Sequence, residues 1–272
     1  MIIDTHAHLN FSAYKNDVGE VVEKTLNNDI WIVNAGSQYS TSRRAVQLAE
    51  KYEKGVYAAI GLHPVHLDTG LVKIKGDPEE MSLNTCEEYF DYERYKELAQ
   101  SEKVVAIGEI GLDYYWRPKT KVKLEPFKQK QKELLQKEIA LAKELGLPAI
   151  FHCRMAHDDL ISMLDSTVNG VVHCFTGNQN QFEKYLELGL YFGLNGLIFK
   201  MDSDKIIEQI PLDRILIETD CPYLTPPQEK GRNEPIYIKH VVNKIAQLKN
   251  ISQEELADIT TQNAKKLFNL KT

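Results

Sequence analysis

The residues best suited to chemistry stand near the start of the chain, where the stretch Asp-Thr-His-Ala-His follows an apolar beginning. In an extended strand, residues i and i+2 project from the same face, so Asp4, His6 and His8 would point one way. Two imidazoles on one face can converge on a single metal ion. Paired histidines also occur at ordinary polar strand ends, so a metal site requires further ligands elsewhere in the sequence.

Alternating strand and helix patterns predict the scaffold that must position such ligands. The strand candidates are residues 2–4, 31–36, 56–61, 104–109, 148–153, 170–175, 190–196 and 214–219. They are nearly continuous apolar runs, which is typical of parallel strands covered by helices. Eight such strands in a chain of 272 residues predict the α/β class and a (β/α)₈ TIM barrel. The rival is a doubly wound sheet, but no G-x-G-x-x-G follows the first strand.

Two helices are marked most clearly. The first spans 123–145 and is followed by the stop signals Gly146 and Pro148; the second spans 252–268 and begins with Ser-x-Glu-Glu. The long segment 67–103 contains four aromatic residues. These are Tyr89, Phe90, Tyr92 and Tyr95. We expect them to pack a helix onto the barrel, although stacking on the bases of a single strand is an alternative.

The composition is that of an ordinary globular protein, with 43% hydrophobic and 26% charged residues, and predicts one domain over residues 1–272. A net charge of −6 excludes a global basic field for nucleic acid. No apolar run could span a membrane and no signal peptide precedes the first strand, so we expect a cytoplasmic protein that does not bind a membrane. We also infer no obligate protein partner. Cys86, Cys153, Cys174 and Cys221 form no C-x-x-C pair and are predicted to be buried free thiols.

Six residues of metal-ligand type fall at the carboxyl ends of predicted strands, where the functional groups of such barrels lie. They are His6, His8, Glu109, His152, His173 and Asp220. Each has an ordinary alternative: Glu109 could be a helix cap or an ion-pair partner, Asp220 a turn residue, and a histidine a hydrogen-bonded core residue. Together they would leave several buried polar groups without partners, and a metal centre resolves that difficulty.

The number and types of these ligands predict two metal ions. A zinc ion takes four ligands, so six exceed the needs of one ion and suffice for two ions that share a carboxylate. A mixed set of nitrogen and oxygen ligands accepts zinc, manganese, cobalt or iron, whereas magnesium usually prefers more oxygen. We therefore expect two divalent ions, for which zinc, manganese and magnesium stay open.

Six ordered motifs resemble the TatD family of metal-dependent deoxyribonucleases, within the amidohydrolase-like barrel superfamily. The motifs are DTHAHLN, GLHPVH, VVAIGEIGLDYY, HCFTG, ETDCPYLTP and RNEP, and the resemblance covers about residues 1–270. It implies that His6, His8, Glu109 and Asp220 hold one metal, and that Glu109 bridges to a second metal held by His152 and His173. It also implies hydrolysis of DNA phosphodiester bonds, often from the 3′ end, in repair or DNA degradation.

The sequence departs from the family pattern at three places. Met155 follows Arg154 where the family commonly has an acid; Gly231 precedes Arg232 where a basic residue is common, with Lys230 one place earlier; and the segment 67–103 is longer than usual. The missing acid leaves open what that carboxylate would orient, with Arg154 as the candidate, and the longer segment 67–103 is expected to change substrate access there.

The predicted mechanism assigns roles to further residues. Asp220 would accept a proton from an attacking water, and His63 would contact the substrate or transfer a proton. His66, Arg154, Arg232 and Asn233 are further candidates for substrate binding. The turn with His63 and His66 could instead be structural, and Arg232 could instead pair with Glu234 or Glu229. Asp4 is expected to orient one imidazole from behind.

The aromatic run Tyr114-Tyr115-Trp116 follows Glu109 closely. It could stack on a terminal base or be buried under a loop.

We therefore expect a metal-dependent hydrolase of DNA, acting as a 3′-to-5′ exonuclease on single-stranded or frayed ends. The alternative is a metal-dependent deacylase or small-molecule hydrolase, for example of aminoacyl-tRNA, because ligands and fold do not determine the substrate. A catalytically silent binding protein is disfavoured by the complete ligand set.

Overall fold

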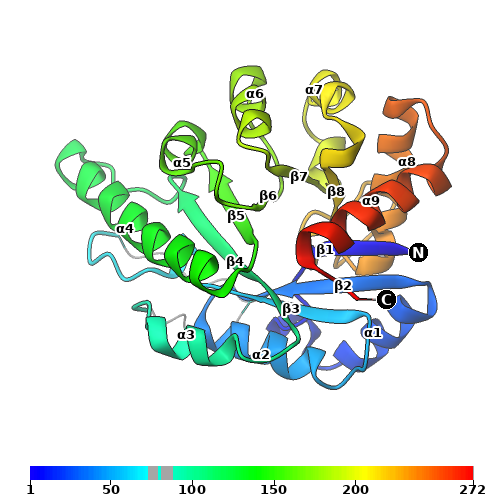
Figure 1. Cartoon of the computed structure of the whole chain (residues 1–272), viewed down its shortest axis with the longest axis horizontal. Helices are drawn as coiled ribbons and strands as arrows, with labels where there is room; N and C mark the ends of the chain where they lie inside the picture. The colour runs from blue at the N-terminus through cyan, green and yellow to red at the C-terminus, as the bar shows by residue number, and fades with distance from the viewer. Residues whose placement is uncertain (73–78, 81–87, 272) are drawn as a thin grey trace.

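The computed structural model describes residues 1–72, 79–80 and 88–271, and their centre is a sheet of eight parallel strands that follow one another in sequence order. The strands curve around a common axis with the helices outside (Figure 1). They are β1 Ile2–Ala7, β2 Ile30–Ala35, β3 Val56–Ile60, β4 Val104–Asp113, β5 Ala149–Arg154, β6 Gly170–Val172, β7 Tyr191–Leu194 and β8 Ile215–Ile217. The predicted (β/α)₈ barrel is confirmed.

The barrel closes between its first and last strands through the chain that continues past β8. The amide of Asp220 donates to the carbonyl of His6 at 2.8 Å, and the amide of His8 donates to the carbonyl of Cys221 at 2.8 Å. Deeper in the seam, the hydroxyl of Thr5 donates to the carbonyl of Ile217. Closure therefore brings Asp220 beside His6 and His8, although more than 200 residues separate them along the chain.

Helices alternate with the strands along the chain. They are α1 Val18–Asn27, α2 Tyr39–Ala49, α3 Tyr92–Leu98, α4 Lys121–Leu145, α5 His157–Met163, α6 Gln179–Glu187, α7 Asp204–Gln209, α8 Ile238–Lys249 and α9 Gln253–Phe268. Gly146 ends α4 with φ +64°, a left-handed conformation that glycine adopts without a steric penalty. Ser252 caps α9 by accepting the amide of Glu255. Both predicted helices are thus confirmed, with α4 beginning two residues earlier than expected.

Apolar side chains fill the inside of the barrel, and α9 closes its amino-terminal end. Inward-facing residues such as Val33, Tyr57 and Ile150 form one buried cluster with Leu267 and Phe268 of α9. The helix lies beside β1, near both chain termini (Figure 1). With this end sealed by packing, polar side chains can gather at the other end, where the strands finish.

The strand ends differ from the prediction in ways that affect the ligands. β1 extends to Ala7 and β4 to Asp113, whereas β6 ends at Val172 and β8 at Ile217. The pairing of β1 with β2 shifts between Asp4 and Ala7. Simple two-residue alternation therefore does not continue from Asp4 to the histidines, because this shift interrupts the regular ladder.

The aromatic residues of the long segment divide into two groups. Tyr95 in α3 is buried and stacks on Phe90 with ring centroids 4.8 Å apart, which confirms packing for these two. Tyr89 instead is 73% exposed. Residues 73–78 and 81–87 of this segment, with the predicted thiol Cys86, lie outside the described residues.

The other cysteines are free thiols, of which Cys153 and Cys221 are buried as predicted. Cys174 is only partly buried, so the prediction was wrong for its burial. The described helices include none with the length and apolarity needed to cross a membrane.

Candidate metal centre

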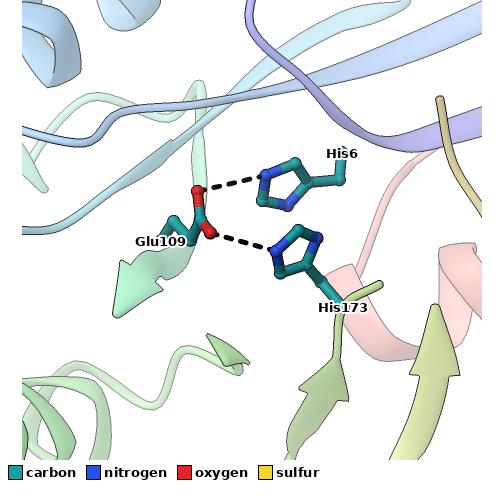
Figure 2. Close-up of side chains that lie close together, drawn as sticks. All are labelled: His6, Glu109 and His173. Atoms are coloured by element: carbon teal, nitrogen blue, oxygen red, sulfur yellow. Dashed lines mark ion pairs between the residues drawn. The ribbon is translucent and has the colours of Figure 1, made fainter. Parts of the chain in front are cut away.

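Glu109 stands at the middle of a group of histidines at the carboxyl-terminal end of the barrel. One carboxylate oxygen lies 2.8 Å from Nδ1 of His152 and 3.0 Å from Nε2 of His173. The other lies 3.4 Å from Nε2 of His6. Figure 2 shows the two oxygens facing His6 and His173 separately. A carboxylate with its two oxygens directed at different histidines could contribute one oxygen to each of two ligand groups.

A second group forms where the barrel closes. The Nε2 atoms of His6 and His8 are 3.1 Å apart, and an oxygen of Asp220 lies 3.3 Å from Nε2 of His8 and 3.7 Å from that of His6. Two ligands about 2.0–2.1 Å from one tetrahedral zinc lie roughly 3.3 Å apart. Nδ1 of His8 is 2.9 Å from the carbonyl of Ala35. Donation to that carbonyl leaves a lone pair on Nε2, as metal binding requires.

His63 belongs to this centre as well. It precedes the short helix η2 (Pro64–His66), and its Nε2 lies 3.4 Å from Glu109. Its ring centroid is 4.2 Å from that of His152. Among the residues that the structure describes, three groups of possible ligands result: His6, Glu109 and His173; His6, His8 and Asp220; and His63, Glu109 and His152. All six residues predicted as ligands are therefore brought together, and His63 lies among them.

The electrostatics favour two ionised carboxylates. Burial by itself raises the pKa of Glu109, but the surrounding histidines outweigh it and hold that pKa well below its ordinary value. Burial likewise opposes ionisation of Asp220, yet His8 and its neighbours lower the pKa overall. The rings of His6 and His173 stack with centroids 3.9 Å apart. Burial first and His173 second lower the pKa of His6, which favours a neutral imidazole able to donate a lone pair.

Two carboxylates that the sequence reasoning missed complete the centre. Asp113 lies 3.2 Å from Nε2 of His152, and Glu218 lies 3.3 Å from Nδ1 of His173. Both carboxylates are buried. Each of these imidazoles therefore stands between Glu109 and a second acid, which can fix ring orientation and tautomer. Both acids stand inside motifs of the family resemblance, in GEIGLDYY and ETDCP. Their position in these motifs is the sequence feature that could have identified them.

The pKa values of the two histidines reflect this double contact. Burial alone lowers the pKa of His152, but hydrogen bonds to Asp113 and Glu109 raise it to about 9. For His173, burial is again outweighed by Glu109 and Glu218, and the pKa rises well above its ordinary value. A strongly acidic environment of this kind attracts cations, whether protons or metal ions.

Contrary to the prediction, Asp4 contacts no imidazole ring that the structure describes. Its carboxylate accepts the amide of Thr219 at 2.9 Å, the hydroxyl of Thr219 at 2.5 Å and the backbone amide of His6 at 3.3 Å. Burial raises the pKa of Asp4 to about 8. Asp4 thus holds the chain after β8 to β1. Among the described residues, Nδ1 of His6 has no hydrogen-bond partner.

Two of the predicted substrate contacts are engaged elsewhere. His66 is buried with Nε2 2.8 Å from Glu80. The guanidinium of Arg232 donates to Asp17 at 2.7 Å and to Glu234 at 3.4 Å. The structure therefore shows the alternative, an ion pair of Arg232 with Glu234, and adds Asp17 as a second partner.

Asn233 and Arg154 take different positions. The buried amide of Asn233 donates to the carbonyls of Thr219 at 3.0 Å and Tyr223 at 2.6 Å, so it braces the loop that carries Asp220. Arg154 ends β5 and is exposed, with its guanidinium carbon 3.7 Å from the ring centre of Tyr115. Of the predicted substrate contacts, His63 and Arg154 are the two beside the centre.

The chain matches known proteins over nearly its full length. The model of the family described as TatD related DNase matches residues 3–269. The uncharacterized metal-dependent hydrolase YabD of Bacillus subtilis (strain 168) is 40% identical over 99% of this chain and 100% of its own length. The 3′-5′ ssDNA/RNA exonuclease TatD of Pantoea vagans (strain C9-1) is 30% identical over 99% of this chain and 100% of its own.

A solved structure supports the same relationship. The crystal structure of YjjV, a TatD homologue from Escherichia coli K12, superposes with a TM-score of 0.80 at 28% identity. The superposition covers 99% of this chain and 98% of that one. Sequence and fold therefore agree.

Proposed function

The chain belongs to the TatD-related DNase family of metal-dependent hydrolases, and on this premise we propose that it hydrolyses phosphodiester bonds of single-stranded DNA from the 3′ end. The observation that carries the proposal is the position of Glu109, a buried ionised carboxylate in contact with five histidines. Relatives named as exonucleases of single-stranded DNA and RNA match the full chain and support this substrate class.

The donor set fits two divalent cations. In our proposal, His6, His8, Glu109 and Asp220 would hold one ion, and Glu109, His152 and His173 would hold a second. Divalent ions bound there would activate water and offset charge on the phosphate. Nitrogen and carboxylate ligands suit zinc or manganese, and magnesium stays an option.

The protein's own side chains would then divide the remaining work. Asp220 is 15% exposed and Glu109 7%, so Asp220 is the carboxylate more open to an incoming water and is assigned as proton acceptor. His63, 12% exposed, borders Glu109 from the side of η2 and is assigned to the phosphate or the leaving group. Arg154 stands at the edge of the centre, where its guanidinium is assigned to a phosphate of the substrate backbone.

Purified protein incubated with end-labelled single-stranded and duplex DNA provides the test. We expect cleavage from the 3′ end of the single strand that EDTA stops and Mn²⁺, Zn²⁺ or Mg²⁺ restores. Asp220→Asn should lose activity. Asp213→Asn should retain it, because the Asp213 side chain is 74% exposed and does not belong to the centre.

The same preparation separates the competing function. Hydrolysis of an acylated tRNA without any metal-dependent cleavage of DNA or RNA would overturn the nuclease proposal and favour a deacylase. Cleavage at internal sites would contradict the assignment of 3′-to-5′ action.

A further inference from the structure

The segment that follows β4 has a charge opposite to that of the whole chain. Residues 114–123 contain Arg117, Lys119, Lys121 and Lys123 and no acid, in a protein whose net charge is −6. All four cations are exposed, and none of them forms an ion pair with any residue that the structure describes. Lys121 and Lys123 stand in the first turn of α4, where the helix dipole disfavours cations. Contacts among the described residues therefore do not account for this basic run.

Two aromatic side chains precede the basic run and are left open to solvent. Tyr115 is 49% exposed and Trp116 48%, with their ring centroids 4.9 Å apart and edge to face. Rings of this size usually bury most of their surface. The preceding residue behaves differently: Tyr114 is buried and its hydroxyl donates to Asp159 at 2.8 Å. Packing thus uses the first aromatic residue and leaves the next two available.

The base of this segment is held firmly beside the metal centre. The amide of Tyr115 donates to the carboxylate of Asp113 at 2.8 Å, and that carboxylate also contacts His152. The amide of Tyr114 donates to the carbonyl of Arg154 at 2.9 Å. The guanidinium of Arg154 covers one face of Tyr115. Aromatic faces and a planar cation therefore lie directly next to the residues that form the centre.

We propose that Tyr115, Trp116 and Arg154 form a stacking site for an unpaired base of the substrate. In the same proposal, Arg117, Lys119, Lys121 and Lys123 contact the phosphates of the adjacent nucleotides. A base in a duplex is already stacked and paired, so this site selects single strands. The inference rests on the proposed function, because it places the strand whose end enters the metal centre.

Binding of a fluorescein-labelled oligothymidylate, measured by anisotropy with EDTA present to prevent cleavage, tests the stacking site. Tyr115→Ala with Trp116→Ala should weaken binding by about tenfold or more, since a stacked base contributes a comparable factor. Tyr115→Phe with Trp116→Phe should restore it, because the aromatic faces remain. Circular dichroism and thermal unfolding should show that both variants fold.

Salt dependence tests the basic run. Replacing its four cations with Gln should reduce the slope of log Kd against log salt by up to about 3, at roughly 0.7 for each phosphate contact with a single strand. Lys51→Gln with Lys54→Gln, two exposed lysines in the turn that precedes β3, serves as the control and should leave the slope unchanged.

Unchanged affinity in the double alanine variant, or equally strong competition by polyglutamate and oligothymidylate, would overturn the stacking site. An unchanged salt slope in the Gln variant would overturn the phosphate contacts. Tight binding of oligothymidylate that depends on both, without cleavage under any metal, would instead refute the proposed nuclease function and leave the site standing.

Discussion

The two ends of the barrel differ in the kind of side chain that they bury. At the amino-terminal end, Leu267 and Phe268 of α9 complete an apolar cluster with side chains from inside the barrel. At the carboxyl-terminal end, Glu109 is buried and Asp220 is partly buried, with histidines around both. Burial of apolar surface stabilises the fold, whereas burial of charge costs free energy unless cations or hydrogen bonds compensate. The amino-terminal end of the barrel thus contributes apolar packing, whereas the carboxyl-terminal end carries the groups suited to chemistry.

Glu109→Gln should have the largest effect on activity, because it removes the negative charge that the surrounding histidines share. We expect kcat/KM on end-labelled single-stranded DNA to fall roughly a thousandfold, which corresponds to about 4 kcal/mol of barrier. Glu53→Gln, at an exposed position before β3, is the matched control and should retain activity. Wild-type activity in Glu109→Gln would refute the role of this carboxylate.

Phe268→Ala should affect the other end of the barrel. Removing a ring that is 2% exposed leaves a cavity, so the free energy of unfolding in urea should fall by about 3–5 kcal/mol. The activity of the folded fraction should not change. Val122→Ala, at a side chain that is 85% exposed, should change stability by less than about 0.5 kcal/mol. A large loss of activity in folded Phe268→Ala would show that the two ends are coupled.

Acid should destabilise the protein through a histidine outside the metal centre. Burial lowers the pKa of His157 from 6.5 to about 4, and its ring contacts Tyr185 and Thr176. Between these two pH values the unfolded chain binds a proton that the folded chain does not. Stability should therefore fall as the pH drops from 6.5 towards 4, by about 3 kcal/mol in total.

Urea unfolding at several pH values measures this loss, and His157→Gln provides the comparison because Gln cannot bind that proton. The variant should lose less stability between pH 6.5 and 4 than the natural chain. An identical pH dependence in both would assign the acid sensitivity to other groups, including those of the centre.

Metal binding should give the smallest effect of the series. Mn²⁺ at a hundred times its Kd should raise the free energy of unfolding by about 2.7 kcal/mol, because it binds the folded state only. Thermal unfolding with and without EDTA measures the shift, and calorimetric titration gives the stoichiometry. Glu109→Gln should reduce both. An equal shift in that variant would place the bound ion away from the centre.

The scaffold could be predicted well because the sequence signals for strands and helices are local. Apolar runs with turn and capping residues between them define strands and helices without knowledge of distant contacts. Their boundaries were less accurate: β4 continues four residues past its predicted end at Glu109, to Asp113. That extension places Asp113 beside His152, and the shorter predicted strand concealed this contact.

The candidate site could likewise be predicted only in part. Its ligand types could be predicted because parallel strands in a barrel deliver their carboxyl ends to one place, so that His6 and Asp220 must approach each other. The partners of Arg232 and Asn233 could not be predicted. Arg232 pairs with Asp17 across more than 200 residues of sequence, and a motif says nothing about which surface a long side chain will meet.

The order of strands and helices, the end of the barrel that carries the polar groups, and the residue types available there all follow from local patterns in the sequence. The folded arrangement was needed to find that Asp113 and Glu218 stand behind His152 and His173, that Asp4 binds the main chain of His6, and that Tyr115 and Trp116 remain exposed. The reason is physical: backbone direction follows from local pattern, whereas the contacts of a side chain depend on which distant neighbours packing brings within hydrogen-bonding distance.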